Sequence, residues 1–332
     1  MRILVTGSAG HLGEALMRLL TTQGFDAVGL DLRPSPFTAV VGSITDREIV
    51  RAAMQSIEAV VHTATLHKPH VVTHTKQDFI ETNLSGTLIL LEEAVTAGVG
   101  RVVFTSTTSA FGAALTPSRD TPATWIDEDV VPVPKNIYGV TKTAAEDLCA
   151  LFAVRHGLGC IALRTSRFFP EVDDSAEMRN AFDDENAKAN EFLFRRVDIE
   201  DAAMAHICAL RAIRGPGFRR YVISATTPFT RADLASLPRD PARVVGERYP
   251  AFEPIYTQFG YRMFADIGRV YVNARAREEL CWRPRHDFGS VLEQLSRRER
   301  IGSVLSRQVG MKGYHDEVFA DGPYPTEESP SS

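Results

Sequence analysis

Tyr138 and Lys142 are the residues whose types and spacing most directly suggest chemistry. They belong to the stretch KNIYGVTK at residues 135–142, and positions four apart lie on the same face of a helix. An ammonium beside a phenol favours the ionised phenol and would lower a pKa that is ordinarily about 10. Such a phenolate could take a proton from an alcohol. The alternative is an ordinary exposed helix face, and the pair taken alone favours that alternative.

A glycine motif near the N-terminus changes this balance. Gly7, Gly10 and Gly13 follow a predicted strand and open a predicted helix. Glycines placed there allow a tight turn and close approach of the backbone to a pyrophosphate, beside the positive end of a helix. Asp31 ends the next predicted strand, where a carboxylate would bind adenosine ribose hydroxyls and repel a 2′-phosphate. The motif therefore favours NAD over NADP, although Arg33 could soften that preference; the alternative is a tight turn with a solvated aspartate.

Alternating strand and helix patterns must position these residues. Strands are predicted at 2–7, 26–31, 59–65, 101–107 and 160–166, and helices at 11–24, 46–56, 85–98 and 136–157. This alternation predicts an α/β fold with a doubly wound parallel sheet, covered by helices on both faces. The ligand crevice of such a sheet lies at the carboxyl ends of its strands.

The pattern weakens after residue 166. The acidic stretch 171–192 predicts irregular structure or a short helix, and further elements are predicted as a helix at 195–213, a strand at 219–226 and short helices at 231–237 and 287–298. We predict an NAD-binding Rossmann domain at 1–166, to which 197–225 returns, and a smaller C-terminal substrate-binding region made of 167–196 and 226–320. Residues 321–332 have the composition of a flexible tail.

Composition restricts the possible partners. The net charge of −5 argues against nucleic acid, and no apolar run approaches the roughly 18 residues of a membrane span. The chain opens with a predicted strand and not with a secretory signal. Four scattered cysteines, Cys149, Cys160, Cys208 and Cys281, lack the spacing of a zinc site or a disulfide framework. We read them as structural thiols, and a cytoplasmic location is expected.

With these residues in view, the chain resembles the extended short-chain dehydrogenase/reductase family of the NAD-dependent epimerase/dehydratase type. The resemblance covers most of residues 1–300 and rests on six motifs in the family's order: TGSAGHLG, VVHTAT, TNLSGT, FTSTTSAFG, YGVTK and AREELCWRPR. The family includes nucleotide-sugar epimerases, dehydratases and sugar dehydrogenases. The motifs are therefore specific for the family and much less specific for the reaction.

The resemblance implies roles for individual residues. Tyr138 would be the catalytic acid/base, Lys142 would bind the nicotinamide ribose and keep the tyrosine acidic, and Thr107 would hydrogen-bond the reacting oxygen. These roles agree physically, because an alcohol that loses hydride to nicotinamide must also lose its hydroxyl proton. Asn83 is expected to fix backbone geometry. The implied cofactor contacts are Gly7, Gly10, His11, Leu12, Gly13, Asp31, Ser43, Ile44, Thr63, Ala64, Thr65, Tyr138 and Lys142.

Three departures from the family's patterns narrow the reaction. The dehydratases carry an Asp–Glu pair after the catalytic threonine, where this chain has Thr108 and Ser109, so dehydration is not expected. Ser43 stands where the family often has an aspartate against the adenine. Arg167 stands where nucleotide-sugar epimerases carry asparagine, and the short stretch that follows resembles dehydrogenases of free sugars or sugar acids.

Several residues are candidates for substrate binding. Arg167, Arg195 and Arg196 could bind an anionic group, or could pair with the acidic run at 171–185. His67, His70 and His74 have a spacing that suggests metal, but no carboxylate or cysteine accompanies them, so no metal is predicted. His206 is interpreted as a core residue. The residues implied for substrate are His67, Lys68, Thr108, Arg167 and Arg195.

The sequence thus predicts an NAD-dependent enzyme acting on a secondary alcohol of a sugar-like substrate. The first interpretation is a nucleotide-sugar 4-epimerase of the UDP-glucose type that works through a keto intermediate. The alternative is a net dehydrogenase of a free sugar, a sugar acid or another small anionic alcohol, and a third is a non-catalytic NAD(H)-sensing protein. By analogy with the family, a homodimer is expected through the helices near 84–97 and 138–154.

Overall fold

The computed structural model describes residues 1–113, 121–313 and 319, so the predicted tail at 321–332 lies outside the described residues. Its centre is a seven-stranded, fully parallel sheet with the order β3-β2-β1-β4-β5-β7-β8. The strands are β1 (Arg2–Thr6), β2 (Asp26–Asp31), β3 (Val40–Val41), β4 (Ala59–His62), β5 (Arg101–Thr107), β7 (Gly159–Thr165) and β8 (Gly217–Ile223). The direction of winding reverses between β1 and β4, and the predicted doubly wound α/β fold is confirmed.

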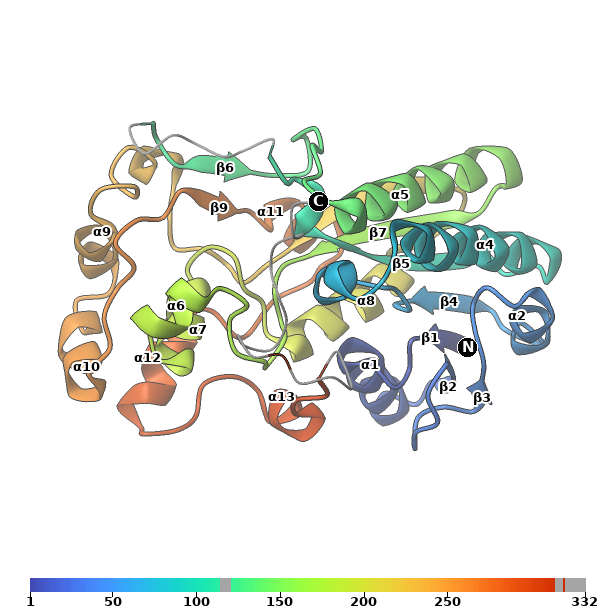
Figure 1. Cartoon of the computed structure of the whole chain (residues 1–332), viewed down its shortest axis with the longest axis horizontal. Coiled ribbons are helices and arrows are strands. Elements are labelled where there is room, and N and C mark those ends of the chain that lie inside the picture. The colour runs from blue at the N-terminus through green and yellow to red at the C-terminus, as the bar shows by residue number, and fades with distance from the viewer. Residues whose placement is uncertain (114–120, 314–318, 320–332) are drawn as a thin grey trace.

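Helices cover both faces of the sheet (Figure 1). They are α1 (His11–Thr22) and α8 (Ile199–Ala212) on one face, and α2 (Arg47–Ala53), α4 (Gly86–Thr96) and α5 (Ile137–His156) on the other. Successive strand residues point to opposite faces, so Ile3 and Val5 pack with α1 while Leu4 packs with the other helices. Both faces of the strands are therefore apolar, which produces the continuous β-branched runs of the sequence.

The capping of α5 fixes where Tyr138 stands. The Asn136 side chain accepts a hydrogen bond of 3.0 Å from the backbone N–H of Gly139, so the helix begins immediately before the tyrosine. Gly157 follows the helix with a φ of +67°, a left-handed conformation that favours glycine. Tyr138 thus occupies the first turn of α5, beside the carboxyl end of β5.

A second apolar cluster lies beyond the carboxyl ends of the main strands (Figure 1). Its helices are α6 (Ala176–Ala181), α7 (Asp184–Glu191), α9 (Pro241–Arg248), α10 (Phe252–Phe259) and α12 (Phe288–Ser296). A small parallel pair, β6 (Thr124–Ile126) and β9 (Arg269–Tyr271), lies at its side. The last helices, α11 (Ala274–Glu279) and α13 (Val304–Val309), return to the main sheet and contribute Ala276 and Leu305 to the core on the α1 side.

Short helical turns form the connections at the carboxyl end of the sheet. They are η1 (Lys68–Val72), α3 (Lys76–Phe79), the π-helical η2 (Ile80–Ser85), η3 (Thr108–Ala110) and η4 (Arg231–Asp233). Within the described part of the chain, no helix is both long and apolar enough to cross a membrane. The four cysteines are free thiols, of which Cys149 and Cys160 are buried and Cys281 is exposed.

Candidate active site

One cavity of about 920 Å³ lies at the carboxyl ends of the strands. It is bounded by the glycine loop, by the segments that follow β2, β4, β5 and β7, and by the first turns of α5. Every residue predicted to contact cofactor or substrate, and all three predicted catalytic residues, line this one cavity. Topology explains why, because parallel strands deliver all their carboxyl ends to the same edge of the sheet.

The glycine loop has the geometry of a phosphate cradle. Gly7 has a φ of +74°, and a Cβ at that position would lie 2.8 Å from the backbone nitrogen of Ala64. A Cβ at Gly13 would lie 1.9 Å from the Gly7 carbonyl oxygen, so α1 could not pack this closely with any larger residue. Because α1 starts at His11, its N-terminal end faces the cavity with backbone N–H groups able to hold a pyrophosphate.

Asp31 is positioned for a ribose at the end of β2. One carboxylate oxygen accepts a 2.9 Å hydrogen bond from the Ala9 backbone, and the other accepts a 2.8 Å bond from the Arg33 backbone. The carboxylate is thereby fixed in orientation at the cavity wall, where the predicted ribose contact would form.

Small polar and apolar side chains line the part of the cavity where the adenine contact is predicted. Ser43 and the buried Ile44 follow β3, and the Ser43 hydroxyl accepts a 3.1 Å hydrogen bond from the Thr45 backbone. Thr63, Ala64 and Thr65 follow β4, and Leu12 lies in α1. Their hydroxyl groups and apolar surface are the kinds of contact that the predicted adenosine half would need.

Thr107 and Tyr138 come together from different elements. Thr107 ends β5 and caps η3, and its hydroxyl oxygen accepts a 3.0 Å hydrogen bond from the backbone N–H of Ser109 in that turn. Tyr138 stands opposite in the first turn of α5 and shares a side-chain hydrogen bond with Thr107. Both side chains line the cavity while being largely buried. A phenol and a hydroxyl that face one reacting oxygen can hold and transfer its proton.

The expectation that Lys142 makes Tyr138 acidic is wrong for the protein alone. Burial raises the pKa of Tyr138 to about 12, and the hydrogen bond with Thr107 opposes that rise only in part. A phenol removed from water loses the hydration that would stabilise its anion, and this outweighs the favourable interaction assumed from the helical spacing. The Tyr138 phenol is consequently protonated at neutral pH.

Lys142 is buried in an apolar setting. Its ammonium lies 4.1 Å from the centre of the Phe104 ring, and burial lowers the pKa of Lys142 to about 7. In the described part of the chain the ammonium has no ion-pair partner, although the more distant Glu146 raises its pKa slightly. A desolvated ammonium at the cavity wall has hydrogens to donate to a ribose hydroxyl.

Asn83 joins the cofactor side of the cavity to α5. Its side-chain oxygen accepts hydrogen bonds from the Leu66 backbone (2.7 Å) and the Thr65 hydroxyl (2.9 Å). Its amide donates to the Leu66 carbonyl at 2.8 Å and to the Thr141 hydroxyl at 3.0 Å. Asn83 is buried and is absent from the cavity wall, which agrees with the predicted role in backbone geometry.

The part of the cavity that is predicted to bind substrate, called the substrate end below, begins at His67 and Lys68. His67 stacks on Phe169, with ring centres 5.4 Å apart, and the Lys68 ammonium forms an ion pair with Asp174. Thr108 lines the same wall from η3. The pair of Lys68 and Asp174 therefore connects the segment after β4 to the segment after β7.

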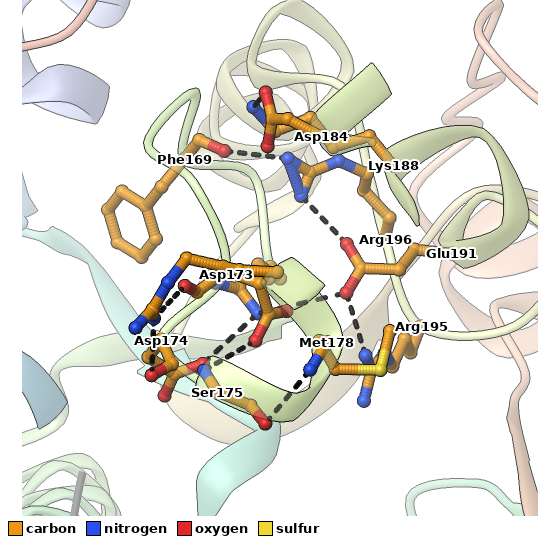
Figure 2. Close-up of polar contacts among 12 residues, drawn as sticks. Phe169, Asp173, Asp174, Ser175, Met178, Asp184, Lys188, Glu191, Arg195 and Arg196 are labelled. Atoms are coloured by element: carbon orange, nitrogen blue, oxygen red, sulfur yellow. Dashed lines mark hydrogen bonds and ion pairs between the residues drawn. The ribbon is translucent and has the colours of Figure 1, made fainter. Parts of the chain in front are cut away.

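The predicted arginines belong to a cluster that contains its own carboxylates (Figure 2). We call this the arginine cluster, and its members are Arg167, Asp173, Asp174, Glu191, Arg195 and Arg196. Arg167 lies 2.7 Å from Asp173 and 3.7 Å from Glu191, while Arg195 lies 2.9 Å from Glu191. Arg167 and Arg195 line the cavity, whereas Arg196 is buried behind it. The pairing of Arg167 with the acidic run is thus present in the structure.

The histidines have two different roles. His67, His70 and His74 form a chain of ring contacts with centres 4.7 Å and 5.1 Å apart. Among the residues described by the structure, no group of three potential ligands could hold a metal ion. His206 is buried and bonded to the Thr105 hydroxyl at 2.8 Å, and burial lowers its pKa to about 4, so it is the neutral core residue that was predicted.

Among the cavity residues that sequence reasoning did not find are Phe169, Glu171 and Lys312, which join separate segments of the wall. Phe169 lies between His67 and His11, with its ring centre 5.4 Å from each. Glu171 accepts a 2.7 Å hydrogen bond from the His11 ring, and Lys312 reaches the cavity from the far end of the chain. The only sequence signal was an acidic residue after two aromatic residues at the exit of a strand, which is too common to identify a site.

Comparisons with known proteins agree with this geometry. The chain belongs to the NAD dependent epimerase/dehydratase family, whose model matches residues 3–224. A UDP-glucose 4-epimerase from Azospirillum brasilense is 27% identical over 323 residues, which cover 86% of this chain and 88% of that protein. An uncharacterized protein, y4nG, from Sinorhizobium fredii is 34% identical over 166 residues, and the matched part spans 39% of that protein's length.

A solved structure extends the similarity in fold. A short-chain dehydrogenase/reductase superfamily protein from Agrobacterium tumefaciens, crystallised with bound NAD, superposes with a TM-score of 0.63. It is 22% identical, and the match covers 93% of this chain and 98% of that chain. The predicted family, NAD as its cofactor and the general class of NAD-dependent epimerase or dehydrogenase are confirmed.

Proposed function

We propose that this chain removes hydride from a secondary alcohol of a sugar-like substrate, with Tyr138 as the acid/base. The observation that carries the proposal is the meeting of Thr107, Tyr138 and Lys142 in the cavity that the glycine loop also lines. Bound NAD would supply the hydride acceptor. Thr107 and Tyr138 would hold the reacting oxygen, and Lys142 would orient the nicotinamide ribose. The protonated Tyr138 suits donation to a carbonyl oxygen, and the Thr107 hydrogen bond assists the reverse transfer by lowering the pKa of the phenol.

The first candidate reaction is 4-epimerisation of a nucleotide sugar of the UDP-glucose type. Oxidation would give a keto sugar, and return of hydride to its opposite face would regenerate NAD. Similarity along almost the whole length of an Azospirillum brasilense UDP-glucose 4-epimerase supports this candidate. The cavity is also large for a ligand site, and is of a size suited to two bound molecules.

The second candidate is a net dehydrogenase of a small anionic sugar or sugar acid. It is favoured by Lys68, Arg167 and Arg195, which bring three cations to the substrate end of the cavity. An anion could take Arg167 only by exchanging with Asp173 and Asp174, which hold it in the structure. The exchange leaves Asp173 without its arginine, so the other contacts of the anion would have to offset that cost.

A single experiment separates these candidates. Purified protein is denatured and the released NAD(H) is measured, and native protein with added NAD is tested against nucleotide sugars, free sugars and sugar acids. A retained cofactor with an isomerised product and no net NADH identifies the epimerase. NADH that accumulates in proportion to substrate identifies the dehydrogenase, and no turnover of any class would contradict both.

The assembly and the division into regions remain proposals. Val140, Leu151 and Val154 expose apolar surface along α5, with 49%, 49% and 82% of their surface accessible. That stripe supports the homodimer expected from the family. The assignment of 167–196 and 226–320 to substrate binding is supported by the apolar cluster beyond the sheet. A cytoplasmic location stays a prediction from the cysteine pattern.

A further inference from the structure

A short segment near the C-terminus, residues 311–313, reaches across the cofactor side of the cavity. It follows α13 after Gly310, whose φ of +62° turns the chain. Lys312 and Gly313 line the same cavity as Gly10 and His11, about three hundred residues earlier in the sequence. We call residues 311–313 the clasp. It bonds to two carboxylates: Glu171, which lines the cavity, and Glu14, which lies in α1 and does not line it.

Glu14 is the first of these carboxylates. It lies in the first turn of α1, and only 9% of its side chain is exposed. A carboxylate there opposes the pyrophosphate that the same helix end would bind, because both are anions in a partly desolvated site. Glu14 is neutralised on both oxygens: Arg18 lies 2.8 Å from one, and the Lys312 ammonium lies 2.6 Å from the other. Arg18 is supplied by α1 itself, and Lys312 adds a second cation that further offsets the repulsion between Glu14 and a bound pyrophosphate.

Glu171 is the second carboxylate, and it lies on the opposite side of the clasp. One of its oxygens accepts hydrogen bonds from the His11 ring (2.7 Å) and from the backbone N–H groups of Lys312 (3.1 Å) and Gly313 (3.2 Å). Burial alone would raise the pKa of Glu171, but the His11 ring and the Lys312 N–H outweigh it and hold that pKa below its usual value. The carboxylate thus holds His11, the first residue of α1, against both the clasp and the segment after β7.

We propose that the clasp is part of the cofactor site, with Lys312 and Glu171 as positioning residues for the pyrophosphate-binding end of α1. Lys312 neutralises Glu14, and Glu171 fixes His11 and thereby the start of the helix. The inference depends on NAD binding and not on which sugar is the substrate. A failure of the proposed reaction would leave it unaffected.

The test measures NADH binding to the full chain by stopped-flow fluorescence and calorimetry. Lys312→Ala is expected to raise the dissociation rate and Kd of NADH about tenfold, which is the size of effect of one charge-assisted hydrogen bond. The association rate is expected to change less than about threefold, because the loss acts after binding. Thermal denaturation checks that the variant is folded as the parent is.

Two matched variants make the result decisive. Arg307→Gln removes one positive charge from the same C-terminal segment, where Arg307 bonds to the Gly302 carbonyl, and it is expected to leave Kd unchanged. Glu14→Gln in the Lys312→Ala background is expected to restore most of the lost affinity. The proposal is overturned if Lys312→Ala binds NADH as tightly as the parent, if only the association rate falls, or if Glu14→Gln gives no rescue.

Discussion

Thr107, Tyr138 and Lys142, the proposed catalytic group, and the arginine cluster lie at the carboxyl ends of neighbouring strands. The two sets of residues differ in how their charges are balanced. In the cluster, Arg167, Arg195 and Arg196 share three carboxylates within ion-pair distance. In the catalytic group, Tyr138 and Lys142 are buried beside a hydroxyl and an aromatic ring, and burial shifts the pKa of each towards its neutral form. The charges of the cluster are paired with one another, as is usual in a stable fold. The ionisable groups of Tyr138 and Lys142 are buried without such pairs, which does not favour folding.

This difference indicates how each region is to be interpreted. Buried charges that pair with one another can be explained by structure alone, without a ligand. A desolvated phenol and ammonium in a cavity wall weaken the fold, and such sites are commonly functional. We therefore assign a function to the proposed catalytic group before any other region. For the arginine cluster, the first explanation is that it supports the structure around the substrate end. Four substitutions test this contrast.

The largest effect is expected for Tyr138→Phe. Removal of the hydroxyl eliminates proton transfer at the reacting oxygen, and kcat should fall by about a thousandfold while the Kd of NADH stays within about twofold. Rates on the active substrate and calorimetry with NADH measure the two quantities. A variant that kept a tenth of the parent's kcat would remove Tyr138 from the chemistry.

Glu191→Gln is expected to lower the stability of the fold, by a smaller free energy than the loss expected for Tyr138→Phe. Glu191 is 2% exposed and balances three arginines, so the change leaves the buried Arg196 with too little negative charge. The free energy of unfolding should fall by about 3 kcal/mol in urea denaturation. Glu253→Gln, an exposed position on α10, serves as the control and should change it by less than about 0.5 kcal/mol. Equal behaviour of the two variants would show that the cluster is not a structural framework.

Lys142→Met is expected to raise the free energy of unfolding, whereas Glu191→Gln lowers it. The variant should be inactive but more stable than the parent by about 2 kcal/mol at pH 7, because a buried ammonium is replaced by an apolar chain. The pKa of Lys142 is lowered to about 7, so the unfolded chain binds more protons than the folded one between pH 7 and about 10. The parent therefore recovers stability as the pH rises through that window, and the difference between the two proteins should shrink. Denaturation curves at several pH values would contradict this if the gap widened.

The smallest effect is expected for Arg167→Gln. If an anionic substrate exchanges with the aspartates, its KM should rise about tenfold while kcat changes less than threefold. The KM of an uncharged sugar analogue provides the comparison and should stay the same. A change in kcat alone would instead place Arg167 with the catalytic group.

The sheet and its helices could be predicted because their signals are local. Buried parallel strands read as apolar runs, and α1, α4 and α5 repeat apolar residues with a helical period. By contrast, β6 and β9 have three residues each and pair across almost 150 positions, so neither carries a local signal. The helices α9, α10 and α13 were missed for a related reason, since they have only six to eight residues each.

In the candidate site too, residues with a local sequence signal could be predicted, and residues that depend on distant contacts could not. Gly7, Asp31, Thr107 and Tyr138 could be placed in one cavity because each stands at a strand exit or a helix start. Glu171 and Lys312 could not, because their contacts join segments 141 residues apart. The pKa of Tyr138 was predicted in the wrong direction, since helical spacing identifies a neighbour but says nothing of how much water remains.

The capping role of Thr107 has a consequence for the direction of its hydrogen bonds. Its oxygen already receives the Ser109 N–H, which occupies one lone pair and points it into the turn. One lone pair and the hydroxyl hydrogen of Thr107 are left to face Tyr138, and the bond to the Ser109 N–H holds the hydroxyl in place before any substrate arrives. Thr107 can therefore accept a hydrogen bond from the neutral phenol and donate one to its anion, so it can stay bonded to the Tyr138 oxygen while the proton moves.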